Sequence, residues 1–370
     1  MHKSVLILGG YGNFGKRISA ALANKGIPVL IAGRNFQKAS NLARSIGANA
    51  TPLQLDIETG LARALEEHQP CVVVNTVGPF QGHGYEVACT AIEHKVHYID
   101  LADGREFVAG IGKLDQQAQS AGVAVISGAS TVPALSDAVV TAFESDFARI
   151  DHMKFGIAPG QRAERGLATT RAILSYVGRR LAPFKGIRSD IYGWQDIYRQ
   201  RYPSLGARWM ANCDIPDLDL LPDRHNIKTI QFSAGLELGP LHLGLWVISH
   251  FVRLGLPIPL ERMAPALLSI SNWFNSFGSK DGGMHVFLTG ESAQNTGQRI
   301  ERSWFIIARN GSGPHIPTIP AIILAARIAN GGHLDAGAMP CLGLVSLADY
   351  LSELEPMEIE VVTHLRSIAP

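Results

Sequence analysis

Short apolar runs alternate with stretches of helical spacing along the first third of the chain. The runs that predict strands lie at residues 5–9, 28–33, 53–56, 71–76, 96–100 and 123–127. Between them, apolar residues recur at helical spacing, and Asn35 and Gly47 are suited to cap the two ends of the second helix. This alternation predicts an α/β fold with a Rossmann doubly wound parallel sheet.

The alternation is lost beyond about residue 135. Strand-like stretches follow at residues 151–159, 227–235, 283–290 and 298–310, and the QNTG sequence at 294–297 is typical of a hairpin turn. We therefore expect a dinucleotide-binding domain over residues 1–135. A second α+β domain with a mixed or antiparallel sheet is expected over 136–370, for substrate binding and dimerisation. A helix at 321–330, ended by two glycines, could pack back on the first domain.

One segment, residues 241–260, is strongly apolar. A helix that spans a membrane needs about 20 apolar residues with few breaks. Here His242, His250 and Arg253 interrupt the segment, and two prolines follow. We expect a buried helix or a lid over a pocket, with membrane contact as the alternative.

Charge and cysteine content indicate which partners and which cellular compartment to expect. The 33 Lys and Arg residues nearly balance the 32 Asp and Glu residues, so net charge does not favour a nucleic acid as partner. The four cysteines form no CxxC pair, which is typical of a reducing compartment and predicts a cytoplasmic protein. His94 and His97 lack a third ligand at useful spacing, so we expect no metal site.

The glycine-rich sequence GGYGNFG directly follows the first predicted strand and opens the first predicted helix. Glycines in this position permit a tight turn and let the backbone approach a pyrophosphate, while the helix start offers unpaired amides. The predicted pyrophosphate site consists of Gly10, Tyr11, Gly12, Asn13, Phe14 and Gly15.

The end of the second strand indicates which dinucleotide is bound. An acidic residue there would bind the ribose hydroxyls of NAD, but the sequence has Arg34 followed by Asn35. Because an arginine can grip a 2′-phosphate through two charged hydrogen bonds, NADP is the expected cofactor. Asp56, at the end of the third strand, could face the adenine or cap the next helix.

Three segments, 75–84, 98–107 and 127–133, follow strands whose carboxyl ends should meet at one edge of the sheet. His83 and Tyr85 are the candidate proton donors for reduction of a C=O or C=N bond. For each of them, a purely structural role is the alternative. The candidate substrate-binding residues, which could hold a carboxylate or wall a pocket, are Arg105, Arg162, Trp194 and Arg208.

Three sequences, GGYGNFG, NTVGPFQGHGYEVACTAIEHKVHYIDLADGREF and SGASTVPALSDAVV, occur in this order and spacing. They resemble the saccharopine dehydrogenase-like oxidoreductases that have an N-terminal NADP-binding domain, and the resemblance covers about the first 145 residues. It implies two domains with the nicotinamide between them. It also implies that the loop after the fourth strand lines the nicotinamide, through Val77, Gly78, Pro79 and Phe80.

Together these features predict an NADP-dependent oxidoreductase that transfers hydride to or from a small carbonyl or imine, plausibly a carboxylate or amino acid derivative. A short-chain dehydrogenase is excluded because none of the 8 tyrosines is followed by a lysine four residues later. The alternative is an NADP-binding redox sensor or scaffold without turnover, in contact with a membrane through residues 241–260. A homodimer with a small-molecule substrate is expected.

Overall fold

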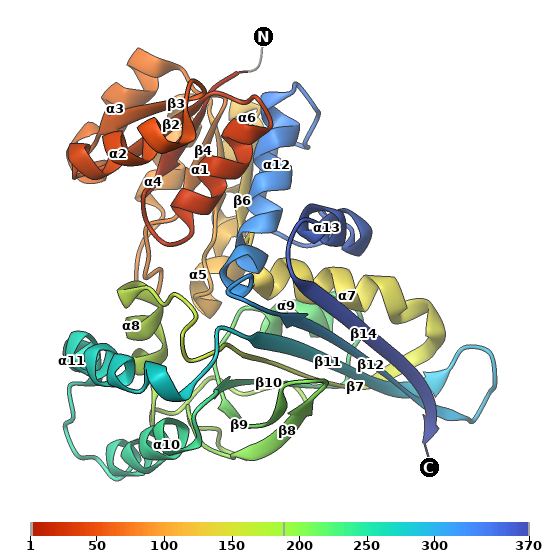
Figure 1. The fold of residues 1–370 in the computed structure, drawn as a ribbon. Helices are drawn as coiled ribbons and strands as arrows, with labels where there is room; N and C mark the ends of the chain where they lie inside the picture. Colours follow the sequence, from red (N-terminus) through yellow and green to blue (C-terminus); the bar gives the residue numbers. More distant parts are fainter. Residues whose placement is uncertain (1–2, 188, 369–370) are drawn as a thin grey trace. The chain divides into compact units, whose positions relative to one another are not determined.

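The computed structural model describes residues 3–187 and 189–368 (Figure 1). The chain divides into two compact units. Unit 1 comprises Met1–Leu135 and His315–Tyr350, and unit 2 comprises Ser136–Pro314 and Leu351–Pro370. The sequence analysis placed residues 136–370 in the second domain, with a helix at 321–330 that could pack back on the first, and the segment His315–Tyr350, which contains this helix, belongs to unit 1.

Unit 1 is built on a seven-stranded parallel sheet in the order β13-β6-β5-β4-β1-β2-β3. Its strands are β1 (Val5–Leu8), β2 (Val29–Gly33), β3 (Ala50–Gln54), β4 (Val72–Asn75), β5 (His97–Asp100), β6 (Ala124–Ser127) and β13 (Gly337–Pro340). The order of the first six strands is that of a doubly wound dinucleotide fold. The predicted Rossmann sheet is thus confirmed, and β13 extends it beyond β6.

Helices cover both faces of this sheet. They are α1 (Gly15–Asn24), α2 (Phe36–Ile46), α3 (Ile57–His68), α4 (Glu86–Glu93), α5 (Arg105–Ala109), α6 (Asp115–Ala121) and α12 (Ile319–Ala329), with α13 (Leu347–Leu354) at the junction of the units. Asn35 and Gly47 cap α2 as predicted. Between α5 and α6 lies a 3-10 segment, Ile111–Leu114, and a Cβ atom on Gly110 just before it would lie 2.6 Å from the Tyr85 hydroxyl.

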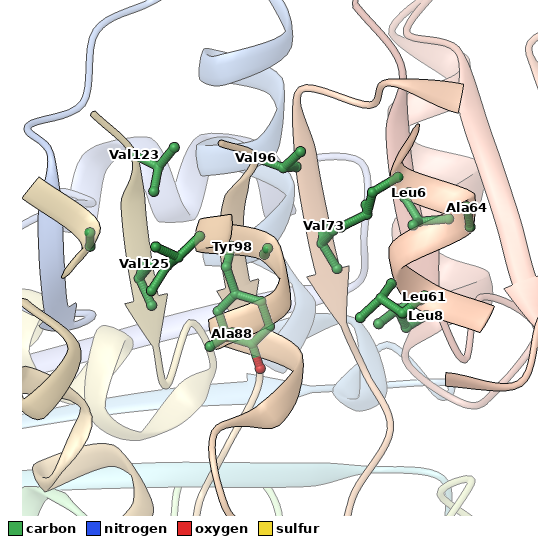
Figure 2. Close-up of a cluster of buried hydrophobic side chains, with 14 of the residues drawn as sticks. Leu6, Leu8, Leu61, Ala64, Val73, Ala88, Val96, Tyr98, Val123 and Val125 are labelled. Atoms are coloured by element: carbon green, nitrogen blue, oxygen red, sulfur yellow. The ribbon is translucent and has the colours of Figure 1, made fainter. Parts of the chain in front are cut away.

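The core of unit 1 lies between the sheet and the helices on each face. On one face, Leu6, Val73 and Val125 from neighbouring strands pack with Leu61 of α3 and Ala88 of α4 (Figure 2). The other face is covered in part by α12, which is apolar on nearly all sides and packs beside α1 and β4. An all-apolar helix needs burial on several sides, which this position provides.

Unit 2 contains a second seven-stranded sheet in the order β14-β12-β11-β7-β10-β9-β8. Its strands are β7 (Phe147–Ala158), β8 (Tyr198–Tyr202), β9 (Gly206–Asn212), β10 (Thr229–Leu236), β11 (Gly282–Ser292), β12 (Arg299–Ala308) and β14 (Ile359–Ile368). Only β7 and β10 pair in parallel, so the predicted mixed sheet is confirmed. The QNTG sequence lies in the β11–β12 hairpin, as expected.

Five helices belong to unit 2: α7 (Ser136–Phe143), α8 (Leu167–Tyr176), α9 (Asp217–Arg224), α10 (Gly239–Arg253) and α11 (Leu260–Trp273). Short 3-10 segments across the chain are Ile111–Leu114, Glu144–Asp146, Asn275–Phe277 and Gly313–Thr318. Within α10, only His242 and Ser249 are buried, so the expectation of a buried helix at 241–260 is wrong. Among the described residues, we find no helix with the length and hydropathy to cross a membrane.

Candidate cofactor site

The glycine-rich loop between β1 and α1 is a tight turn that requires glycine at particular positions. Gly9 has a positive φ of 70°, and its carbonyl accepts a 2.7 Å hydrogen bond from the Gly12 amide. A Cβ atom on Gly15 would lie 2.2 Å from the Gly9 carbonyl oxygen. Any side chain at Gly15 would therefore push α1 away from the turn, which explains the third glycine of the motif.

The start of α1 is suited to bind an anion. No side chain caps the helix at Phe14, and its first turn contains no acidic residue. The Arg17 guanidinium adds a positive charge here, because it donates to the backbone and side-chain oxygens of Asn13. Uncapped amides, the helix dipole and this cation all favour negative oxygens. The loop thus fits a pyrophosphate.

Tyr11 connects the glycine-rich loop to the end of β2. Its hydroxyl accepts a 3.0 Å hydrogen bond from the Asn35 amide. A Cβ atom on Gly33 would lie 2.4 Å from the Tyr11 ring, so the ring lies directly against the end of the strand. The position of Arg34 is therefore fixed relative to the pyrophosphate loop.

Arg34 is exposed at the carboxyl end of β2, and its carbonyl accepts a 3.3 Å hydrogen bond from the Gln54 amide group. Asn35 caps α2 by accepting a hydrogen bond from the Lys38 amide, and the first turn of α2 has no acidic residue. Lys38 thus supplies a second cation one turn from Arg34. Of the two roles considered for Asp56, the observed one is capping, since it accepts from the Glu58 amide at the start of α3.

The loop after β4 lies directly beside the glycine-rich loop. The Thr76 hydroxyl donates to the Leu8 carbonyl over 2.8 Å, and a Cβ atom on Gly9 would come within 2.9 Å of Val77. Val77 itself is exposed. The segment then runs through Gly78 and Pro79 to Phe80, whose ring packs on Phe107 at 5.2 Å between centroids. The turn expected to line the nicotinamide therefore adjoins the phosphate-binding loop.

The two candidate proton donors have different surroundings. His83 is exposed on the loop after β4. Tyr85 is half-buried, stacks on Phe107, and donates a 2.7 Å hydrogen bond to the Phe107 carbonyl. Burial, and to a smaller extent the charge of Asp100, raises the pKa of Tyr85. These contacts give the Tyr85 hydroxyl a structural role, whereas the imidazole of His83 faces solvent.

Asp100, at the carboxyl end of β5, holds together the edge of the sheet. Its buried carboxylate accepts hydrogen bonds from the amides of Ala102 and Gly128 and from the Ser127 hydroxyl, all within 3.0 Å. Burial raises the pKa of Asp100 to about 6, although these hydrogen bonds oppose the shift. Asp100 thus joins the loops after β5 and β6 and positions the backbone there.

The sequence analysis missed His315, which lies in the segment before α12 in unit 1. Burial, then the charges of Arg17 and Lys16, lower the pKa of His315. This electrostatic effect shows that the imidazole lies near the start of α1. About 300 residues separate it from the glycine-rich loop, and no motif surrounds it, so no pattern in the sequence could have indicated this position.

The candidate substrate-binding residues are distributed over both units. Arg105 is buried at the start of α5 in unit 1. In unit 2, Arg162 is exposed, whereas Trp194 is fully buried and its indole donates to the His242 carbonyl. Arg208 is also buried, and it donates to the carbonyls of Ala158 and Asp281 and pairs with Glu237 at 3.5 Å. These contacts account for Trp194 and Arg208 as parts of the interior of unit 2.

Comparison with known proteins agrees with this geometry. Residues 5–126 match the family model of the saccharopine dehydrogenase NADP binding domain. An apo saccharopine dehydrogenase (L-Glu forming) from Saccharomyces cerevisiae is similar in structure, with a TM-score of 0.68 and 14% identity over 99% of this chain and 100% of that chain. An amine dehydrogenase from Mycobacterium smegmatis has a TM-score of 0.47 and 14% identity over 94% and 95% of the two chains. The sequence has no significant match among the curated proteins.

The protein has the fold of a nicotinamide-dinucleotide-binding oxidoreductase. More particularly, residues 5–126 are similar to the NADP binding domain of saccharopine dehydrogenase, the family that the sequence motifs resemble. The likeness in fold to the yeast enzyme extends over both units.

Proposed function

We propose that the protein is an NADP-dependent reductase or dehydrogenase that acts on a small carbonyl or imine. The observation that carries the choice of NADP is Arg34, exposed at the end of β2 where an acidic residue would favour NAD. Arg34 and Lys38, which lie one helical turn apart, would offer two cations to a 2′-phosphate on the ribose. Within the described residues, no carboxylate pairs with Arg34.

Different residues of unit 1 would bind different parts of the cofactor. The loop from Gly10 to Gly15 would bind the pyrophosphate through its amides, and Arg34 with Asn35 would bind the adenosine end. The turn from Val77 to Phe80 would lie along the nicotinamide. The bound cofactor supplies a hydride to the carbon of a C=O or C=N bond, or accepts one in the reverse direction.

A proton must reach the oxygen or nitrogen that the hydride leaves negatively charged. His83 is the proposed donor, because a histidine exchanges a proton near neutral pH and this one has no other side-chain role in the described structure. The Tyr85 hydroxyl is already bound to the Phe107 carbonyl. Arg105 in unit 1 and the exposed Arg162 in unit 2 are separate candidates for binding a substrate carboxylate, since an arginine binds such a group through paired charged hydrogen bonds.

Calorimetric titration with NADPH and NADH tests the choice of cofactor. We expect NADPH to bind about tenfold to a hundredfold more tightly, because charged hydrogen bonds to the 2′-phosphate contribute about 1.5 to 3 kcal/mol. Arg34→Ala should abolish most of this preference by weakening NADPH alone.

Arg44→Ala is the matched control. Arg44 lies in the last turn of the same helix, α2, where it hydrogen-bonds only within that helix, so its loss should leave both affinities unchanged. Equal affinities for NADPH and NADH in the unmodified protein would refute the NADP assignment. Tight NADPH binding without oxidation by any 2-oxo acid or imine would refute the proposed activity instead.

A further inference from the structure

The helices α10 and α11 of unit 2 expose an unusual amount of apolar surface. Leu254 is 78% exposed, Trp273 75% and Phe277 76%. We define the apolar patch as these three residues together with Phe251, Leu256 and Met263, which are also exposed. Contiguous apolar surface of this kind marks a binding site more often than chance.

Both helices rest on one core, so the apolar patch lies on two elements that are fixed to the same part of unit 2. Beneath α10, Leu245, Ile248 and Val252 pack into a hydrophobic cluster, and Leu260 and Ala264 of α11 contribute to the same cluster. With their inner faces occupied in this way, Phe251 and Leu254 of α10 and Met263 of α11 remain on the outer side. Each helix is therefore apolar on two faces. The inner face is covered by the hydrophobic cluster, and the outer face is exposed.

The spacing along α11 shows that the outer apolar face is a stripe and not scattered residues. Met263, Ile270 and Trp273 of α11 recur at intervals of seven and three residues, Phe277 follows in the 3-10 segment Asn275–Phe277, and all four are exposed. An ordinary surface helix carries charged residues at such positions. Here the stripe ends in aromatic residues, which favour the boundary between water and the acyl chains of a bilayer.

The charges around the patch indicate what covers it. From Gly239 to Lys280, the basic residues are Arg253, Arg262 and Lys280, and the only acidic residue is Glu261. Glu261 already pairs with Arg179 of unit 2 at 3.3 Å. Arg253 donates to Gln195 and lies over the ring of Tyr192, whereas Arg262 and Lys280 are exposed. The segment thus carries more basic than acidic side chains, which is complementary to an anionic lipid surface.

A second copy of the chain fits this pattern poorly. In a two-fold symmetric interface the same surface meets itself, so Arg253 and Arg262 would approach the same arginines of the other copy with few carboxylates to pair them. A bilayer instead offers apolar chains and phosphate oxygens to one surface. No described helix can span a membrane, so contact would be peripheral.

We propose that α10, α11 and the loop between them bind the protein to the surface of an anionic membrane. Leu254 and Leu256, with Trp273 and Phe277, enter the boundary between headgroups and acyl chains. Arg262 and Lys280 bind lipid phosphates. This inference is independent of the reaction proposed above, because none of these residues belongs to the candidate cofactor site.

Flotation of the full-length protein with vesicles tests the proposal. It should bind vesicles of phosphatidylcholine with phosphatidylglycerol, and bind vesicles of phosphatidylcholine alone more weakly. The double variant Leu254→Glu with Trp273→Glu should lower the partition coefficient by at least about tenfold, since it places charge in the apolar boundary. Arg262→Gln with Lys280→Gln should lower only the component that depends on the anionic lipid, by about fivefold for each charge and so about 25-fold in all.

Leu365→Glu is the matched control. It makes the same substitution at an exposed leucine of β14, outside the patch, and should bind vesicles like the unmodified protein. Unchanged thermal melting of all variants shows that they fold. Absence of vesicle binding, or equal binding by the Leu254 and Trp273 double variant, would overturn the proposal. So would a dimer in sedimentation without lipid that this double variant dissociates, because the patch would then be an interface between two copies.

Discussion

His83 and Tyr85 are two residues apart, yet their side chains differ in their contacts and exposure. The Tyr85 hydroxyl reaches a backbone carbonyl and the ring stacks on Phe107, so its contacts stabilise the fold. The imidazole of His83 is exposed beside the turn expected to line the nicotinamide. A proton donor must be free to approach a substrate, which His83 is.

Replacement of each residue separates these roles. Once a substrate is found among 2-oxo acids and imines, His83→Gln should lower kcat by about a hundredfold to ten-thousandfold, while the Kd for NADPH stays unchanged. Tyr85→Phe should retain turnover and instead lose about 1 kcal/mol of stability with its hydrogen bond. Steady-state kinetics and calorimetry measure both effects. Full activity of His83→Gln would assign the proton to another group.

Single residues could be predicted from the sequence where their role is local. The roles of Gly15 and Asn35 follow from a turn and a cap, and both are found as expected. The environment of His315 could not be predicted, because the charges that help to lower its pKa, Arg17 and Lys16, are about 300 residues away in the sequence. Arg208 could not be assigned either, since an arginine that binds three groups within its own unit looks, in sequence, like one that binds a ligand.

At the scale of elements, one carboxylate of strand β7 forms ion pairs with side chains from three segments of the sheet. Asp151 is buried and lies 2.7 Å from Arg149, 3.0 Å from Lys228 and 3.3 Å from Arg299. The hydrogen bond from Arg149 and the nearby cations lower the pKa of Asp151 to about 2. These cations come from β7, from the start of β10 and from β12, so the cluster ties three segments of the sheet together.

Asp151→Asn should therefore destabilise the protein at neutral pH. We expect a loss of about 1 to 2 kcal/mol, allowing for solvent around the three cations. Because the carboxyl pKa is lower in the folded state than in the unfolded one, this stabilisation is present above about pH 4 and lost as the pH falls towards 2. The difference in urea midpoint between the two proteins should follow the same course. Asp190→Asn, which breaks an exposed pair with Arg180, should have little effect at any pH.

Elements were predictable where burial imposes a pattern. Strands β1, β4 and β6 of the Rossmann sheet are buried along their whole length and therefore apolar, and all six predicted strands of this sheet were found within a few residues of their predicted places. β14 is exposed along most of its length, and β13 has the sequence GAMP, in which a glycine and a proline favour a turn, so neither has the apolar pattern of a buried strand. In α10 the apolar pattern was clear, but a pattern cannot tell whether the protein itself or a partner covers the face.

At the scale of the whole molecule, unit 1 consists of two distant segments of the chain. The segment His315–Tyr350 supplies α12 and β13, and α12 buries eight residues in unit 1. Without it, β6 is an edge strand and the sheet face beneath α12 is uncovered. The complete sheet of the predicted dinucleotide-binding unit thus includes residues that lie far beyond the glycine-rich motif in the sequence.

Two fragments test this dependence. Residues 1–135 alone should aggregate or melt without cooperativity, because edge strands and bare apolar faces associate. Residues 1–135 joined by a Gly-Ser linker to residues 315–350 should be monomeric and melt in one cooperative transition. Size-exclusion chromatography and thermal circular dichroism compare the two. Cooperative melting of residues 1–135 alone, at the same temperature as the joined fragment, would contradict the argument.

Because β13 is synthesised long after β6, the sheet of unit 1 stays incomplete for an interval during translation. A ribosome completes β6 roughly 200 residues before it completes β13. At about 5–20 residues per second, the unfinished sheet waits roughly 10 to 40 seconds for its last strand. Small domains fold far faster than this, so the pause is set by translation and not by folding. The yield of the protein in a cell should accordingly depend on chaperones that shield the nascent chain during this interval, however stable the finished molecule is.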